Sequence, residues 1–177
     1  MARVFFVIGL LLACLATIYQ YIGRGYLANP YGWSPNFVAV SLGIIMPVAL
    51  WTIANWCLTT LFEGEGSMKD IFMVVCYSTI PYTFLTIVST VLFNFAIHQE
   101  FELLLMLQSF AYVWLGILLF FGCMVVHDYS LGKNILTALG TIVGMGFIMF
   151  VALLFSSLLI RMVGFVNGIY LEVAYRL

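Results

Sequence analysis

Long apolar stretches separated by short polar turns dominate this chain. Five of them are long enough to cross a bilayer as a helix, which takes about 20 apolar residues. They cover residues 1–22, 37–62, 71–97, 103–126 and 135–160. Because a helix satisfies its own backbone hydrogen bonds in lipid, the pattern predicts an all-α integral membrane protein. We expect a single domain over 1–177, with five transmembrane helices and an amphipathic C-terminal tail after residue 161.

The first stretch and the loop that follows it each have an alternative interpretation. A signal peptide has an apolar core of only about 7–15 residues, and the four residues ending at Cys14 loosely resemble a lipoprotein cleavage box. The apolar run continues to Ile22, which favours a retained helix. In the loop, Tyr26, Tyr31 and Trp33 fit an interfacial aromatic belt. An aromatic ligand-binding loop is the alternative.

The second stretch carries a polar stripe at helical spacing. Four residues recur every fourth position and are therefore predicted to share one face: Pro47, Trp51, Asn55 and Thr59. A kink is expected at Pro47, because proline removes a helix hydrogen bond. An amide inside the membrane should face another helix and hold it. A place in a substrate or ion path is the alternative role for Asn55.

The third stretch is expected to kink at Pro81, which frees the carbonyl of Tyr77. Nearby hydroxyls are predicted to help satisfy this turn: Ser78, Thr79 and Thr83. By residue count, the Asn55 amide and the Tyr77 carbonyl lie at similar depth. We therefore predict that they face the same seam between the second and third helices, with a shallow polar pocket there as an alternative.

The polar turns offer few groups for chemistry. In the turn at 63–70, Gly64 and Gly66 permit positive φ, and Ser67 is predicted to cap the next helix with Asp70. A docking point for a soluble partner is the alternative. His127 beside Asp128 suggests a metal or proton site, but too few ligands accompany it, so we expect a solvated histidine.

Glycines and the chain end predict helix packing. Gly140 and Gly144 have the spacing that lets membrane helices approach closely. After Arg161, apolar residues gather on one side of the tail, and Glu172 and Arg176 are spaced for an ion pair.

Composition supports a membrane protein and excludes several other classes. Hydrophobic residues make up 65% and charged residues 7% of the 177, against about 25% charged in soluble domains. Mean hydropathy is +1.18. The net charge of −1 favours no nucleic-acid partner. The four cysteines are isolated within apolar stretches, so we expect neither disulfides nor a metal site. We predict no cofactor and no enzymatic activity.

Several short motifs in a fixed order resemble the Yip (Ypt-interacting protein) domain family, most closely its short bacterial members. They begin with Asn55-Trp56, the turn at 64–67, and Lys69-Asp70. They continue with Tyr77-x-x-x-Pro81-Tyr82, His127-x-Tyr129-Ser130-x-Gly132-Lys133 and Tyr170-x-Glu172. The resemblance covers about 37–177 and implies five transmembrane helices, a cytoplasmic N-terminus and no catalysis. The Asp-Leu-x-Gly-Pro motif of the eukaryotic trafficking members is absent, so only fold and topology are carried over.

These observations predict a scaffold or accessory subunit that organises other membrane proteins in a bacterial cytoplasmic membrane. A transporter component with a polar site between the second and third helices is the alternative, and homo-oligomerisation stays open. The candidate structural or interaction residues are Asn55, Trp56, Gly64, Gly66, Lys69, Tyr77, Pro81, Tyr82, Gly140 and Gly144.

Overall fold

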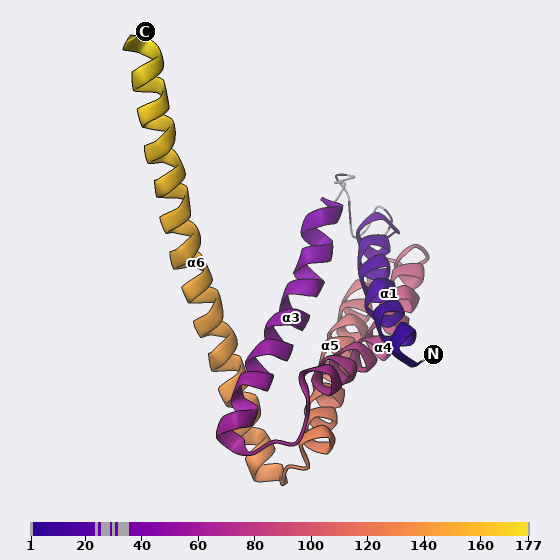
Figure 1. Ribbon diagram of the computed structural model, residues 1–177. Helices are drawn as coiled ribbons and strands as arrows, with labels where there is room; N and C mark the ends of the chain where they lie inside the picture. The colour runs from indigo at the N-terminus through magenta and orange to yellow at the C-terminus, as the bar shows by residue number, and fades with distance from the viewer. Residues whose placement is uncertain (1, 24, 26–28, 30, 32–35, 177) are drawn as a thin grey trace.

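Five helices account for nearly all of the described chain (Figure 1). They are α1 (Ala2–Gly23), α3 (Phe37–Phe62), α4 (Met68–Phe93), α5 (Phe101–His127) and α6 (Leu131–Arg176). The structure, a computed structural model, describes residues 2–23, 25, 29, 31 and 36–176, and within them all side chains except those of 2–7, 173 and 176. Within these residues α3, α4, α5 and α6 are long and apolar enough to span a membrane, and α1 is a shorter apolar helix over Ile8–Gly23. The predicted all-α membrane fold is confirmed.

Local sequence signals set the helix ends. The Asn36 side chain accepts from the N–H groups of Val38 and Ala39 at the start of α3. Ser67 and Asp70 form the predicted capping box at the start of α4, which satisfies two backbone donors that the helix leaves open. Positive φ falls on Glu63 and Asp128, which end α3 and α5 in the left-handed region. Gly64 and Gly66 do not adopt positive φ, so the reason first given for these glycines is wrong.

Helices α1, α4 and α5 pack together as one group, and α3 pairs with α6. A buried polar network joins the first group. The Gln20 amide donates to the side-chain oxygen of Gln108 (2.7 Å), and the same oxygen accepts from the Ser89 hydroxyl (2.9 Å). Gln108 in turn donates to the Thr86 hydroxyl at 3.4 Å. The amides are thus satisfied inside an apolar bundle, where an unpaired one would be costly.

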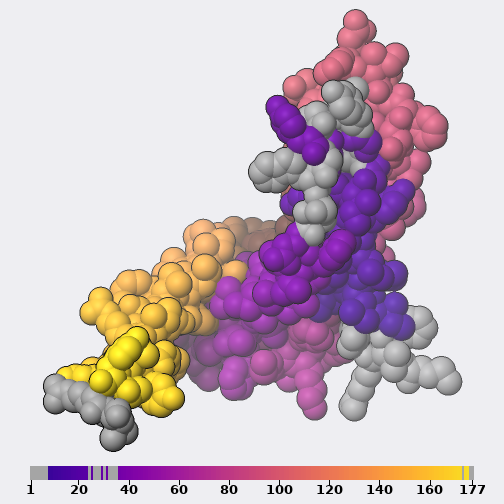
Figure 2. Space-filling model, turned by 90° about the horizontal axis from the view of Figure 1, so that it is seen from above, coloured from indigo at the N-terminus to yellow at the C-terminus, as the bar shows by residue number. Residues whose placement is uncertain are grey.

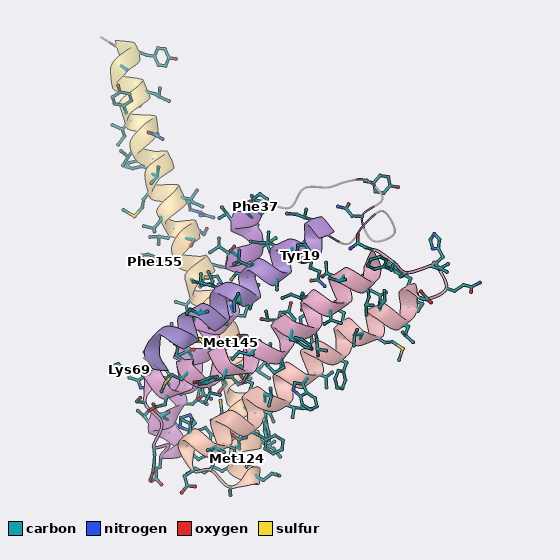
Figure 3. The ribbon with its side chains drawn as sticks, turned by 90° about the vertical axis from the view of Figure 1, so that its right-hand side faces the viewer. Tyr19, Phe37, Lys69, Met124, Met145 and Phe155 are labelled. Atoms are coloured by element: carbon teal, nitrogen blue, oxygen red, sulfur yellow. The ribbon has the colours of Figure 1, made fainter. Side chains whose placement is uncertain are left out.

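The N-terminal end of α1 and two of the turns lie on one side of the bundle. Gly9 of α1 approaches Cys76 of α4, and Gly23 approaches Thr90, so α1 runs parallel to α4. The turns at 63–67 and 128–130 meet, since the Gly66 N–H lies 3.3 Å from Nδ1 of His127. We call this side the turn face. It carries Lys69 and Met124, which Figure 3 shows at the same end of the molecule.

Gly140 and Gly144 lie at the contact between α6 and α3. A Cβ on Gly140 would come within 2.6 Å of a Leu58 methyl, and one on Gly144 within 3.5 Å of the Ala54 Cβ. The missing side chain at Gly140 therefore lets the two helices approach closely, whereas a Cβ on Gly144 would make an ordinary van der Waals contact.

Helix α6 is longer than the predicted fifth span. It continues without interruption for 46 residues, or about 69 Å, so the segment expected as a tail is its C-terminal continuation. From residue 149 to residue 172 every side chain is exposed, and Figure 2 shows this half projecting away from the other helices. The expected pair of Glu172 and Arg176 lies outside the described side chains.

The two prolines that lie inside helices, Pro47 and Pro81, do not interrupt them. α3 runs through Pro47 and α4 through Pro81. The hydroxyls expected near the Tyr77 carbonyl donate elsewhere, to the carbonyls of Val74, Cys76 and Thr79. In the loop at 24–36, Tyr31 is exposed, whereas Tyr26 and Trp33 lie outside the described residues.

Candidate functional site

A hydrogen-bonded cluster at the turn face joins three helices and the turn that precedes α4. The Gly66 N–H donates to Nδ1 of His127 (3.3 Å), and Nε2 of His127 lies 2.8 Å from the Asn55 side-chain oxygen. The Asn55 amide donates to the Thr141 hydroxyl at 3.0 Å, which donates to the Thr137 carbonyl at 2.8 Å. These five residues, together with Gly64 and Tyr129, are called the turn cluster below.

Each hydrogen bond in this series runs from donor to acceptor in the same sense, from Gly66 to Thr137. This determines the tautomer of His127. Because Nδ1 accepts from a backbone N–H, the proton of the neutral imidazole sits on Nε2 and is donated to Asn55. Asn55 then uses its own amide N–H toward Thr141. His127 is 2% exposed and Asn55 is 1% exposed, so each polar group in the chain depends on its neighbour.

Glycine at two turn positions makes room for this arrangement. A Cβ on Gly64 would lie 2.3 Å from the Tyr129 hydroxyl oxygen and 2.7 Å from Nδ1 of His127. On Gly66 it would lie 2.5 Å from a Val126 methyl and 2.8 Å from Nδ1 of His127. All four distances are below van der Waals contact, so the two turns meet this closely only because these side chains are absent.

Tyr129 packs against one face of the His127 imidazole ring. Its ring stacks on the imidazole with centroids 4.9 Å apart and planes 18° apart. The ammonium of Lys133 lies 4.8 Å from the Tyr129 ring centroid, a cation–π contact. Burial raises the pKa of the Tyr129 phenol, so it remains neutral in this stack.

Two predictions for this region are wrong. His127 was expected to be solvated, but the packing of one turn on the other buries it. Asn55 lies inside the protein, but its bonds run to α5 and α6, rather than to the Tyr77 carbonyl of α4. Residue counting places Tyr77 at the depth of Asn55 and His127 at the end of α5, so depth alone points to the wrong partner.

The remaining candidate residues are spread over the molecule. Trp56 and Tyr77 are about half exposed, and Lys69 is exposed at the turn face. Pro81 lies inside α4. Tyr82 is buried, and its hydroxyl lies 3.4 Å from those of Thr17 and Tyr112.

A second feature is a cavity of about 640 Å³ between the two groups of helices, here called the membrane groove. Pro47 and Trp51 of the predicted stripe line it on α3, opposite Thr79 and Tyr82 of α4. Asn55 does not line it. A pocket between the second and third helices therefore exists, but its walls are largely apolar, contrary to the polar pocket considered from the sequence.

Both ring nitrogens of His127 are engaged in hydrogen bonds. Within the described part of the chain, no three His, Cys, Asp or Glu residues lie together in a way that could hold a metal ion. The described residues that line the groove include no charged side chain.

Several residues of the turn cluster and of the polar network between α1, α4 and α5 were not predicted. Thr137 and Thr141 follow each other by four positions in α6, and Gln20, Ser89 and Gln108 lie within three different apolar stretches. Polar residues buried in apolar spans are the signal that could have found them, because such groups face protein. Their pairing depends on how the helices are placed around one another.

The class of this protein is now defined: it is an all-helical, multi-pass membrane protein. A model of the Yip1 domain family matches residues 1–155, so the chain belongs to that family. The match includes the first helix and ends within α6, whereas the resemblance seen in the sequence covered about 37–177. No curated protein matches the chain, and no solved structure does either.

Proposed function

We propose that this protein is a non-enzymatic scaffold that binds other membrane proteins along the C-terminal half of α6. The observation that carries the proposal is that all side chains of 149–172 are exposed. The hydrocarbon core of a bilayer is about 30 Å thick, and α6 is about 69 Å long. If α6 is upright, apolar side chains such as Met162, Phe165 and Ile169 extend beyond the lipid, where a partner would shield them from water.

Two further observations, the turn cluster and the extent of the family match, support this role for α6. The turn cluster holds the ends of α3, α4, α5 and α6 together, which gives the exposed half of α6 a rigid base. The family match ends at residue 155, so the last part of α6 lies beyond the shared domain. We place the protein in a bacterial cytoplasmic membrane with the turn face toward the cytoplasm, in line with the resemblance and with the cation-free turn at 98–102.

Site-specific photo-crosslinking tests the scaffold proposal. A benzophenone amino acid replaces Phe155 on α6 or, as a control, Phe84 on α4; both side chains are exposed, at 62% and 66%. In native membranes, position 155 should give adducts with proteins of discrete mass, whereas position 84 should give mainly lipid adducts. Lipid adducts alone at both positions would contradict the proposal. An adduct of twice the chain's mass would instead indicate that the protein associates with itself, and this would overturn the scaffold proposal.

A deletion separates partner binding from folding. Removing 162–177 leaves the matched region and the contacts of Gly140 and Gly144 with α3 intact. The shortened protein should keep its thermal stability in detergent and lose the proteins that co-purify with the full chain.

The transporter alternative retains one supporting observation, the groove between α3 and α4. Against it, ion-coupled carriers generally use Asp, Glu, Lys, Arg or His inside the membrane, and none of these is among the described residues that line this groove.

A further inference from the structure

The membrane groove is placed and shaped for a lipid chain. Its wall follows one face of α3 from Ala39 to Trp51. These residues are twelve positions apart, so the groove extends about 18 Å along the helix. One leaflet of hydrocarbon is about 15 Å deep, half of the bilayer core.

The groove is closed toward the turn face. Below Trp51, α3 contacts α6 where Gly144 meets Ala54 and Gly140 meets Leu58, and the turn cluster follows. At the other end, Ala39 and Tyr21 line the groove close to the end of α1 and the start of α3. An occupant therefore enters from the leaflet opposite the turn face.

The chemistry of the walls favours an apolar occupant. Among the residues that the structure describes, none of those lining the groove is charged. The hydroxyls of Thr17 and Thr79 donate to carbonyls of their own helices, those of Ala13 and Cys76. At the deep end, the buried indole N–H of Trp51 has no hydrogen-bond partner among the described residues. Apolar cavities of this kind do not hold water well.

We propose that the groove binds one acyl chain of a bilayer phospholipid from the leaflet opposite the turn face, with the headgroup left at the membrane surface near Tyr21. The volume of about 640 Å³ is in the range of known ligand pockets, roughly 300–1,000 Å³. A membrane-spanning helix from a partner needs about 30 Å of length and does not fit the 18 Å available. This binding is independent of the scaffold role of α6.

Trp51 gives a direct optical readout. In a variant with Trp33→Phe, Trp56→Phe and Trp114→Phe, Trp51 is the remaining tryptophan. It is reconstituted in vesicles of phosphatidylcholine brominated either at the chain end or near the carbonyl. Because the chain end should lie at the deep end of the groove, the first lipid should quench Trp51 fluorescence strongly and the second only weakly.

Gly43 allows the groove to be filled without disturbing the fold. It lines the groove, and an added Cβ there meets no atom within 4 Å. Gly43→Phe should reduce the quenching of Trp51 at least threefold. Gly164→Phe is the matched control, because Gly164 is equally open and lies far along α6; it should leave the quenching unchanged.

A second tryptophan, Trp56, serves as the control for ordinary contact with the bilayer. A variant that retains Trp56 alone, which is 47% exposed, should be quenched equally with and without Gly43→Phe. The proposal is overturned if Trp51 is not quenched, which would mean that the groove closes in lipid, or if Gly43→Phe leaves its quenching unchanged. Quenching that falls as the protein-to-lipid ratio rises would also overturn it, because a second copy of the chain would then occupy the groove.

Discussion

Replacing Gly66 by alanine should destabilise the protein, because the position has no room for a methyl group. The added Cβ would lie 2.5 Å from a Val126 methyl and 2.8 Å from Nδ1 of His127. The imidazole is held by Asn55 on its far side and stacked on Tyr129, so it cannot move without breaking a bond. Overpacking of this kind costs about 1–3 kcal/mol.

The expected effect is large enough to measure by thermal unfolding in detergent. For a chain of this size, each kcal/mol shifts Tm by about 2–4 °C, so Gly66→Ala should lower Tm by about 2–12 °C. Gly132→Ala is the matched control, because a Cβ at that helical position meets nothing within 4 Å. It should leave Tm unchanged or raise it slightly, since alanine favours helix over glycine by about 1 kcal/mol.

A second substitution checks the steric reason. Val126→Ala removes the nearest obstructing methyl and should recover part of the stability lost in Gly66→Ala. If Gly66→Ala is as stable as Gly132→Ala, the two turns do not pack as described and the reasoning is refuted.

Two further predictions concern the helix bundle and its topology. Gln108→Leu should lower Tm because it leaves the Gln20 amide buried without its partner; the double substitution with Gln20→Leu should be less harmful than Gln108→Leu alone, and a worse double variant would contradict the network. On a cysteine-free background, Ser67→Cys and Ser130→Cys should react with an impermeant maleimide from the same side of the membrane; labelling from opposite sides would refute the shared turn face.

The sequence was sufficient for the helices because lipid imposes a simple rule on length and polarity. The predicted limits of 37–62 coincide with α3, and the capping pair of Ser67 and Asp70 locates the start of α4. The end of α6 was less accessible. Arg161 ends the apolar run at 135–160, but a single cation does not end a helix, and α6 continues to Arg176.

The partners within the turn cluster could not be predicted for a different reason. Residue counting gives the depth of Asn55 but not the neighbour that its side chain faces. It favoured Tyr77, whereas the actual partner, His127, is the last residue of α5. His127 looks solvated in a polar turn of sequence. It becomes buried only because a second turn, at 63–67, folds over it, and that contact joins residues 61 positions apart.

The most direct test of the central claim is a double-mutant cycle between Asn55 and His127. The claim is that these family-motif residues form a structural lock between the helix ends. Asn55→Leu, His127→Leu and the double variant are compared by their free energies of unfolding in mixed micelles. Polar pairs in membrane proteins couple by about 0.6 kcal/mol on average and up to about 1.7 kcal/mol. We expect a coupling within or above this range for Asn55 and His127, and additivity within about 0.5 kcal/mol for His127 and Gln108, which belong to separate networks. Additive effects of Asn55→Leu and His127→Leu would contradict the lock.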